Sequence, residues 1–480
     1  MMERQHAANR HALRPSPAPG LFVGLCFLFV CAAGNADDWA TYRSDIVRTG
    51  VSPETVGPEL FPAWTYVPTH RPTPAWPMPS EEVPRMHVDN ALRVAVAGGS
   101  VYFGCPVTGE VHALDAASGR ARWTFAAQGP VRFAPTCCNG RVYFGSDDGY
   151  VYCLDARNGS LLWKHRPGPS DEKVIGNGRL ISLWPVRTSV LVDGGVAYAT
   201  AGVFPYEGVH VCALRAADGA VIWNNDSVSD RVYELEFGGI SPHGYLVASK
   251  DRLYVPSGRA MPAAFDRRTG EFLFYASPGG HQGGVWAMLD GDRLVAGTVY
   301  SESQGMLEFP IKIAFDAATG QPQPNAFGLF PAIELVPTPD VLYVLTRHGI
   351  DAVDRGDYGR VSREGAPTIR ERKVLQRRLF TLRLRAADSV EPDKEIRLQI
   401  EGLTRRLDVL KAKEDTLRNS CLRWHYAASG LVSLIKAGDI FYAGGRGIVV
   451  GVNARTGKEI SRQAVTGTAV GLAASGGLLL

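Results

Sequence analysis

The stretch HALDAASGRARW at residues 112–123 is followed forty positions later by YCLDARNGSLLW at residues 152–163. Each copy places a Gly four residues after an Asp and a Trp eight residues after it. The shared positions are Asp115, Gly119 and Trp123 in the first copy and Asp155, Gly159 and Trp163 in the second. A repeat of this length indicates an architecture built from equivalent supersecondary units.

Weaker copies of the same frame continue along the chain. They lie at Arg215, Gly219 and Trp223, at Asp266, at Asp316 and at Asn453, with a worn copy at Asp354. An apolar, β-prone run such as RVYFGS (141–146) precedes the copies. Each unit is therefore predicted to be a four-stranded antiparallel meander of about 40 residues, which is the size of a propeller blade.

The residue types of the frame explain why it repeats. An Asp or Asn that opens a turn accepts backbone N–H bonds, and the Gly supplies the positive φ that turns the chain back. The Trp is expected to fill the gap between neighbouring blades, where its burial contributes about 2 to 3 kcal/mol. One blade cannot bury both of its faces, whereas a closed ring of blades can.

The complete frame, formed by Ala113, Asp115, Gly119 and Trp123, resembles the tryptophan-docking repeat of the pyrroloquinoline-quinone (PQQ) repeat superfamily. That superfamily includes quinoprotein alcohol dehydrogenases and the propeller lipoprotein of the outer-membrane β-barrel assembly machinery. The opening stretch from Asp38 to Trp64 is similar to the N-termini of these proteins, and especially to exported PQQ-like propellers of planctomycetes. The resemblance covers nearly the whole chain after residue 36 and implies an all-β propeller.

The number of frames predicts eight blades. Seven Asp-type turns are visible when the worn copy at Asp354 is counted, and Trp64 resembles the outer strand of an eighth blade. The last residues, 471–480, correspond to only the innermost strand of that closing blade and the start of the next strand. We therefore expect an eight-bladed propeller whose closing blade is incomplete at the C-terminus, with an unpaired sheet edge there.

One segment interrupts the blades. Residues 362–420 are dense in Arg, Lys and Glu, and apolar residues recur at helical spacing: Ile396, Ile400, Leu403, Leu407, Leu410 and Leu417. This pattern predicts a coiled-coil-like helical hairpin, after which Trp424 resumes the blade that is interrupted at Asp354. Two interpretations are open: an arm that docks a partner, or a solvated insertion whose helices pack only on each other.

The N-terminus has the pattern of a cleaved signal peptide. Arg4, Arg10 and Arg14 precede an apolar run at residues 21–30, and small residues follow at 34–36. Ten apolar residues are too few to span a bilayer, which takes about 20. We expect residues 1–36 to be removed and the protein to be periplasmic or secreted, with no transmembrane segment after cleavage.

The predicted organisation of the remaining chain has four parts. Residues 37–90 form an N-terminal segment with a closing-blade strand and a Pro-rich loop, residues 91–361 form propeller blades, residues 362–420 form the insertion, and residues 421–480 form the final blades. The formal net charge of the whole chain is only +3, which argues against a dedicated nucleic-acid binder.

Three cationic or titratable residues occupy equivalent positions before innermost strands. Arg132, Arg187 and His243 each lie eleven residues before a strand tyrosine, and the first two share the string Pro-Val-Arg. If the blades are equivalent, the three side chains converge on one mouth of the central channel and form an electropositive pocket for a carboxylate or phosphate. The alternative is that the arginines pair with neighbouring carboxylates.

The adjacent Cys137 and Cys138 allow two interpretations. The resemblance implies one of them, because quinoprotein dehydrogenases carry a vicinal disulfide against their cofactor. The other is a pair of separate thiols, one on each face of a strand. The chain has no C-x-x-C-H haem site, and its Cys spacing matches no zinc pattern.

The residues that would hold Ca²⁺ and abstract a proton in a quinoprotein dehydrogenase have no recognisable match in this sequence. We therefore expect no catalytic or metal-binding residues, and a non-catalytic, exported PQQ-like propeller that acts as a binding or scaffolding module in the cell envelope. Its partner would be an envelope protein or an anionic small molecule. The alternative is an oxidoreductase that uses PQQ with calcium.

Overall fold

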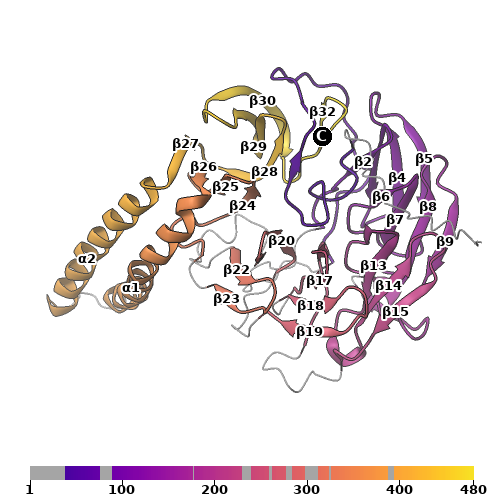
Figure 1. Cartoon of the computed structure of the whole chain (residues 1–480), viewed down its shortest axis with the longest axis horizontal. Helices are drawn as coiled ribbons and strands as arrows, with labels where there is room; N and C mark the ends of the chain where they lie inside the picture. The colour runs from indigo at the N-terminus through magenta and orange to yellow at the C-terminus, as the bar shows by residue number, and fades with distance from the viewer. Residues whose placement is uncertain are drawn as a thin grey trace, which may run out of the picture.

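Seven four-stranded sheets follow one another around a ring in the computed structural model (Figure 1). The structure describes residues 38–75, 89–176, 178–229, 239–258, 262–276, 284–297, 312–323, 326–387 and 394–480. The predicted signal peptide lies outside these residues. In blades 1 to 6 consecutive strands pair antiparallel, and the first strand of each blade is the innermost.

The strands of the first four blades are short. Blade 1 contains β2 (Ala95–Ala97), β3 (Ser100–Gly104), β4 (Glu110–Asp115) and β5 (Ala121–Ala126), and blade 2 contains β6 (Thr136–Cys138), β7 (Arg141–Gly145), β8 (Val151–Asp155) and β9 (Leu161–His165). Blade 3 contains β12 (Leu191–Asp193), β13 (Val196–Ala201), β14 (His210–Arg215) and β15 (Val221–Asn225), and blade 4 contains β16 (Val247–Ala248), β17 (Arg252–Val255), β18 (Ala263–Asp266) and β19 (Phe272–Tyr275).

The remaining blades carry the irregular features. Blade 5 contains β20 (Trp286–Asp290), β21 (Arg293–Gly297), β22 (Lys312–Asp316) and β23 (Pro322–Gln323), and blade 6 contains β24 (Glu334–Pro337), β25 (Val341–Thr346), β26 (Gly349–Asp354) and β27 (Leu422–Ala427). Blade 7 contains β28 (Leu431–Ala437), β29 (Ile440–Asn453) and β30 (Glu459–Thr468), with β1 (Val51–Ser52) parallel to β28 on its inner side.

The predicted count of eight blades is wrong, because the structure has seven four-stranded blades. After β30 the chain adds only a two-stranded sheet of β31 (Ala474–Ser475) and β32 (Leu478–Leu479). The stretch around Trp64, expected to be the outer strand of an eighth blade, is not a strand and pairs with neither of them. Residues from both ends of the described chain nevertheless share one apolar cluster with blades 1 and 7.

The aromatic side chains of the frame dock on the next blade as donors. The indole N–H of Trp123 donates to the carbonyl oxygen of Ala156 at 3.0 Å, and that of Trp163 donates to Ala216 at 3.1 Å. Trp64, Trp223 and Trp424 donate in the same way to Ala116, Arg267 and Ala454. Trp64 therefore docks on blade 1 although it is not part of a strand.

The glycine of the frame is required for two reasons, its backbone conformation and its contact with the docked ring. Gly159 has a φ of 72°, which side chains other than Gly rarely adopt. A Cβ placed on it would lie 2.6 Å from the indole ring of Trp123, which is closer than two carbon atoms can approach. The same glycine thus permits the turn and accepts the docking ring from the previous blade.

The helical insertion replaces this docking between blades 5 and 6. The Asp354 turn leads directly into α1 (Arg355–Ala387), earlier than the predicted start at residue 362. Tyr358 of α1 donates its hydroxyl to the carbonyl of Ala326. Apolar side chains of both helices enter the core between the two blades: Tyr358, Val361 and Ile369 from α1 and Leu417 from α2 (Lys394–Asn419).

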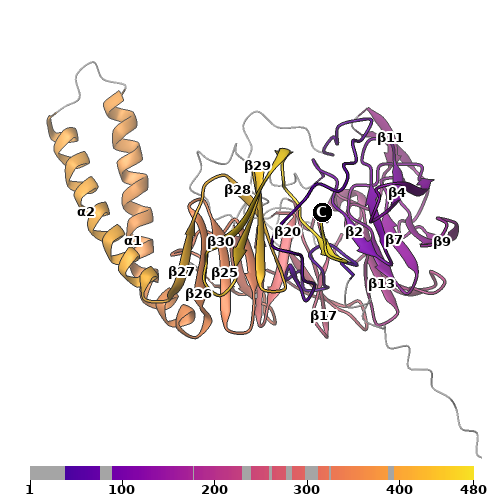
Figure 2. The ribbon, with the colours of Figure 1, turned by 90° about the horizontal axis from the view of Figure 1, so that it is seen from above.

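Beyond this base the hairpin projects away from the blades (Figure 2). Ion pairs join the helices, with Arg372 2.8 Å from Glu414 and Arg406 2.7 Å from Glu371. After α2 the chain returns to blade 6 through β27, where Trp424 lies opposite Ala352 of β26. Among the described residues, no helix combines the length and apolar character that crossing a membrane requires.

Replacing Trp123 with Ala removes a ring that fills the gap between blades 1 and 2. We expect the free energy of unfolding to fall by about 3 kcal/mol. Trp123→Phe keeps a smaller ring and loses the hydrogen bond to Ala156, so it should cost less, about 1 to 2 kcal/mol. Denaturant titration measures both values. An unchanged midpoint for Trp123→Ala would contradict the docking role.

The base of the hairpin should matter for stability and its outer part should not. Replacing residues 375–411 with a short Gly-rich turn leaves the base in place, so the melting temperature should stay within a few degrees of the parent. Ile369→Ala creates a cavity in the core and should cost about 3 kcal/mol. Thermal unfolding followed by circular dichroism distinguishes the two. Equal losses in both variants would show that the division at residue 375 is wrong.

Candidate functional site

The centre of the ring is filled by the chain itself. Residues 39–50, which we call the central segment, run past the innermost strands of most blades (Figure 1). The backbone carbonyls of Trp39, Ala40, Ile46, Val47 and Gly50 accept N–H bonds from Val96, Cys137, Ala248, Leu289 and Lys436, respectively, at 2.7–3.0 Å. These donors lie in blades 1, 2, 4, 5 and 7. A segment of this length can reach them all only if it crosses the middle of the ring.

Two buried arginines fasten the central segment. Arg43 forms an ion pair with Glu334 of β24 at 2.6 Å and donates to the carbonyls of Arg48 and Leu335. Arg48 donates to the carbonyl of Leu246 at 2.9 Å. Both arginines have positive φ, 56° and 68°, a conformation that costs energy in non-Gly residues and persists only when its surroundings hold it. The guanidinium contacts supply that restraint.

Aromatic rings cover one side of the central segment. Tyr42 stacks on Tyr245 with ring centroids 3.7 Å apart, and the hydroxyl oxygen of Tyr245 accepts the backbone N–H of Ala134 at 3.0 Å. Phe133 meets the rings of Tyr245 and His243 edge-on, at 5.1 and 5.5 Å. His243 thereby joins this layer to the residues predicted to line the mouth.

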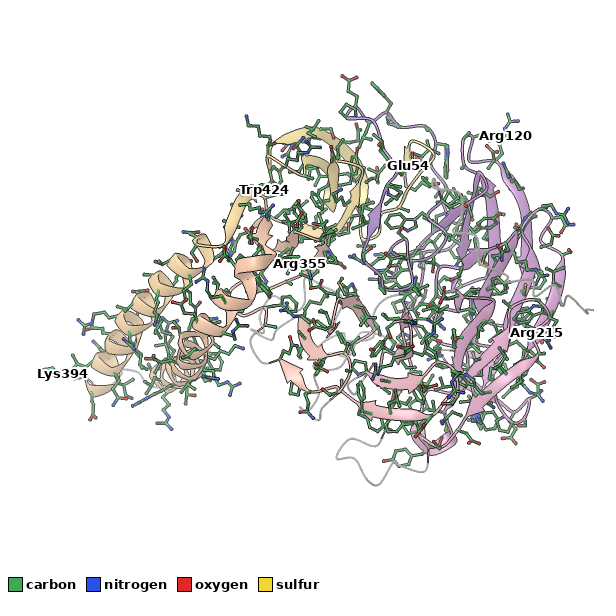
Figure 3. The ribbon with its side chains drawn as sticks, in the orientation of Figure 1. Glu54, Arg120, Arg215, Arg355, Lys394 and Trp424 are labelled. Carbon is green, nitrogen blue, oxygen red and sulfur yellow. The ribbon has the colours of Figure 1, made fainter. Side chains whose placement is uncertain are left out.

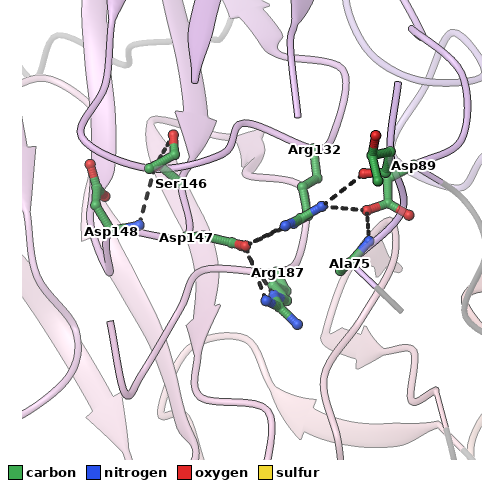
Figure 4. Close-up of polar contacts among 9 residues, drawn as sticks. Ala75, Asp89, Arg132, Ser146, Asp147, Asp148 and Arg187 are labelled. Atoms are coloured by element: carbon green, nitrogen blue, oxygen red, sulfur yellow. Dashed lines mark hydrogen bonds and ion pairs between the residues drawn. The ribbon is translucent and has the colours of Figure 1, made fainter. Parts of the chain in front are cut away.

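Arg132 and Arg187 lie close together, and they share the carboxylate of Asp147 (Figure 4). Arg132 lies 2.8 Å from Asp147 and 2.8 Å from Asp89, and Arg187 lies 3.1 Å from Asp147. All four side chains are buried. We call these four residues and His243 the charged cluster.

The charged cluster is close to neutral. Burial disfavours the charged form of Asp147, but Arg187 and Arg132 outweigh it and hold the pKa of its carboxyl below the usual range. Burial lowers the pKa of His243 to about 4, and Asp89 only partly opposes this shift, so the imidazole is uncharged at neutral pH. Two arginines therefore face two carboxylates. The contacts follow the alternative of arginines paired with carboxylates, and binding of an anionic ligand stays a prediction.

The two carboxylates of the cluster could not be identified from the repeat pattern. Asp147 lies in the turn after β7, and Asp89 lies just before blade 1, where its Oδ2 also accepts the backbone N–H of Ala75 at 2.8 Å. The other oxygen of Asp89, Oδ1, has no hydrogen-bond partner within the described part of the chain and is buried.

Of the two interpretations of the adjacent cysteines, the structure has the separate thiols, since Cys137 and Cys138 are both free. Neighbouring residues of a strand point to opposite faces, and β6 follows this rule. Cys137 packs in the cluster between blades 1 and 2, and Cys138 packs against the cluster between blades 2 and 3. Burial raises the pKa of the Cys137 thiol, which leaves it unreactive at neutral pH.

The charged cluster does not fit calcium. A Ca²⁺ ion takes six to eight oxygen ligands, usually including carboxylates. Arg132 lies between Asp89 and Asp147, in the place that a cation bridging the two carboxylates would need. Within the described ranges, no group of three or more His, Cys, Asp or Glu side chains is arranged to hold a metal.

A family model described as outer membrane protein assembly factor BamB matches residues 73–324. The chain belongs to this PQQ-like β-propeller family. It is also similar to the dehydrogenase subunit of the quinone alcohol dehydrogenase of Gluconobacter oxydans (strain 621H), with 30% identity over 308 residues, which cover 50% of this chain and 38% of the relative. BamB of Yersinia pestis is 27% identical over 150 residues, 30% of this chain and 35% of that protein.

The alignments thus span little more than a third of each of these two PQQ-like relatives. Among solved structures, the quinohemoprotein alcohol dehydrogenase of Comamonas testosteroni aligns with a TM-score of 0.53 and 14% identity. The alignment covers 91% of this chain and 74% of that one. At this identity the likeness shows the shared propeller fold alone.

His243 should make stability depend on pH. Its pKa lies near 4 in the folded protein and its ordinary value is 6.5, so the unfolded chain binds the proton first as pH falls. Stability should decline between pH 6.5 and 4, by about 3 kcal/mol from this group. His243→Gln should flatten that decline, and the exposed His348→Gln should not. Urea titrations across this pH range measure the slopes, and equal slopes in all three proteins would refute the assignment.

Proposed function

We propose that this protein is a non-catalytic PQQ-like propeller that serves as a binding or scaffolding module in the cell envelope, periplasmic or secreted. Its family model carries the name of an outer membrane protein assembly factor. The signal-peptide pattern of residues 1–36 supports export. The likeness to both BamB and a dehydrogenase subunit leaves the choice between binding and catalysis to the geometry of the chain.

The filled centre of the ring carries the proposal. Propellers that act on small molecules need room at the axis, since ligand sites are concave. Here the central segment occupies the axis, and Arg43 and Arg48 bind it to inner strands. On the side of the charged cluster, the guanidinium groups are engaged by Asp147 and Asp89. What such a molecule offers to a partner is its outer surface.

One outer surface borders the charged cluster. The hairpin of β10 (Lys173–Gly176) and β11 (Arg179–Ser182) exposes Ile175 and Leu180, which are 81% and 62% accessible. The backbone N–H of Ser182 donates to the carbonyl of Asp147 at 2.8 Å, so the hairpin rises beside the cluster. Exposed apolar side chains on a two-stranded hairpin favour contact with another protein. An envelope protein is the partner that this hairpin surface suits. An anionic small molecule bound at the charged cluster is the second kind of partner proposed.

The alternative function is a PQQ- and calcium-dependent oxidoreductase. The identity of 30% to a quinone-dependent alcohol dehydrogenase subunit favours it. The position of Arg132 between the two buried carboxylates disfavours this function, because a bound Ca²⁺ would have to displace its guanidinium group.

The first arm of the test separates these functions by titrating the purified protein with PQQ in the presence of Ca²⁺. Tryptophan fluorescence and calorimetry should show no saturable binding. Saturable, Ca²⁺-dependent binding, together with alcohol-dependent reduction of an artificial electron acceptor, would replace the scaffold with the dehydrogenase. Arg132→Lys, which keeps the charge but not the forked geometry, should then weaken PQQ binding.

The second arm tests for a protein partner. A photo-cross-linking amino acid replaces Ile175 in the full chain, expressed in its native cells, and a matched control places it at Ile222, which is 51% exposed on the outer strand β15. We expect one discrete envelope-protein adduct from position 175 and none from position 222. The absence of any adduct at 175, or the same adducts at both positions, would count against a scaffold that uses this surface.

A further inference from the structure

The outer part of α1 is unusually basic. Residues 372–387, RKVLQRRLFTLRLRAA, contain six Arg or Lys residues and no Asp or Glu. The whole chain carries a net charge of only +3. Charge of one sign is therefore concentrated on a single projecting element, which we call the basic arm and define as residues 372–387.

Three exposed arginines of the basic arm lack a carboxylate partner in the described part of the chain. Arg377, Arg378 and Arg383 are exposed, and none of them forms an ion pair with an acidic residue of the described chain. Some exposed arginines on the blades have carboxylate partners, among them Arg122 with Asp115, Arg157 with Asp155, Arg423 with Asp354, Arg455 with Asp439 and Arg462 with Glu459. The two acidic residues at the level of the start of the arm are already paired, Glu371 with Arg406 and Glu414 with Arg372.

Large apolar side chains are exposed among these arginines. Val374 and Phe380 are each 64% accessible and Leu384 is 52% accessible. Their positions in the helix lie on the side away from Leu379 and Leu382, which are buried where α1 packs on α2. The basic arm is thus apolar on both sides, and only the inner side has a partner in the structure.

The arm is placed to reach a surface. It lies at the end of the hairpin far from the blades, next to Lys394 at the start of α2 (Figure 3). Arg397 and Leu398 of α2 are also exposed there, next to the exposed Lys394 and Glu395. The propeller does not shield this end of the hairpin in either view (Figures 1 and 2).

We infer that the basic arm binds an anionic lipid surface, with its arginines on the headgroup phosphates and Phe380 and Leu384 inserted at the boundary of the acyl chains. This inference rests on the proposed location in the cell envelope. Arginine forks match phosphate oxygens, and a helix with apolar and basic residues interleaved on one side lies in the plane of such an interface. A second copy of the arm is a poor partner because the like charges repel.

Vesicle binding by the purified full protein tests the inference. Vesicles of phosphatidylglycerol and phosphatidylcholine in equal parts should bind the protein in a sedimentation assay, and pure phosphatidylcholine vesicles should not. Added salt should weaken the binding. The triple variant Arg377→Glu, Arg378→Glu, Arg383→Glu should reduce the partition coefficient at least tenfold, because each basic residue near an anionic surface contributes about fivefold. The matched control is Arg363→Glu, Arg370→Glu, which changes exposed charges at the base of α1 and should bind almost as the parent does.

The variant Phe380→Ser, Leu384→Ser separates a lipid surface from other anionic partners. It keeps every charge and should still lose several-fold in vesicle binding, since its apolar contribution is gone. The inference would be overturned if this variant bound vesicles as well as the parent does and the parent bound soluble heparin as well as it binds vesicles. The partner would then be a polyanion or an acidic protein surface. No binding to anionic vesicles, or an equal loss in the base control, would also overturn it. Neither result bears on the proposed function, which the PQQ titration and the cross-linking decide.

Discussion

The ion pair between Arg43 and Glu334 holds the centre of this propeller together. It joins residues that are 291 positions apart and buries both charges. Removing one partner of such a pair costs about 3 to 5 kcal/mol, since it leaves the other charge buried without compensation. The backbone bonds of the central segment to the inner strands depend on the same anchorage, because Arg43 and Arg48 are held in a left-handed conformation by their side-chain contacts.

The outer part of the ring is joined differently, because blades 1 to 4 and blade 6 each dock an aromatic ring on the turn of the next blade and Trp64 docks on the turn of blade 1. The interface between blades 5 and 6 shows what happens when that turn is replaced. The helical insertion starts where the turn would be, and it brings Tyr358, Val361 and Ile369 into the gap. The hairpin is therefore part of the ring at its base and an independent arm at its tip. This division allows the tip to acquire new chemistry without loss of the fold.

The sequence was sufficient for the parts that repeat. The spacing of Asp115, Gly119 and Trp123 predicted the blades and the docking, and the spacing of Ile396 to Leu417 predicted the hairpin. The number of blades could not be obtained in this way, because Trp64 docks on Gly119 like a blade residue without forming a strand. Equivalence of the blades brought Arg132 and Arg187 together. It could not supply Asp89 and Asp147, which lie outside the repeating frame, nor the central segment, whose partners are spread over almost the entire chain.

The distance in sequence between Arg43 and its partner also has a consequence for the order of events during biosynthesis. At 5 to 20 residues per second, Glu334 emerges from the ribosome on the order of 15 to 60 s after Arg43. The central segment cannot reach its native conformation during that interval, although the first blades have all the local contacts they need. The central segment is therefore synthesised before the blades but reaches its native contacts after them. Such long-range closure slows folding and keeps the chain incompletely closed while it is being made, a state compatible with passage through an export channel.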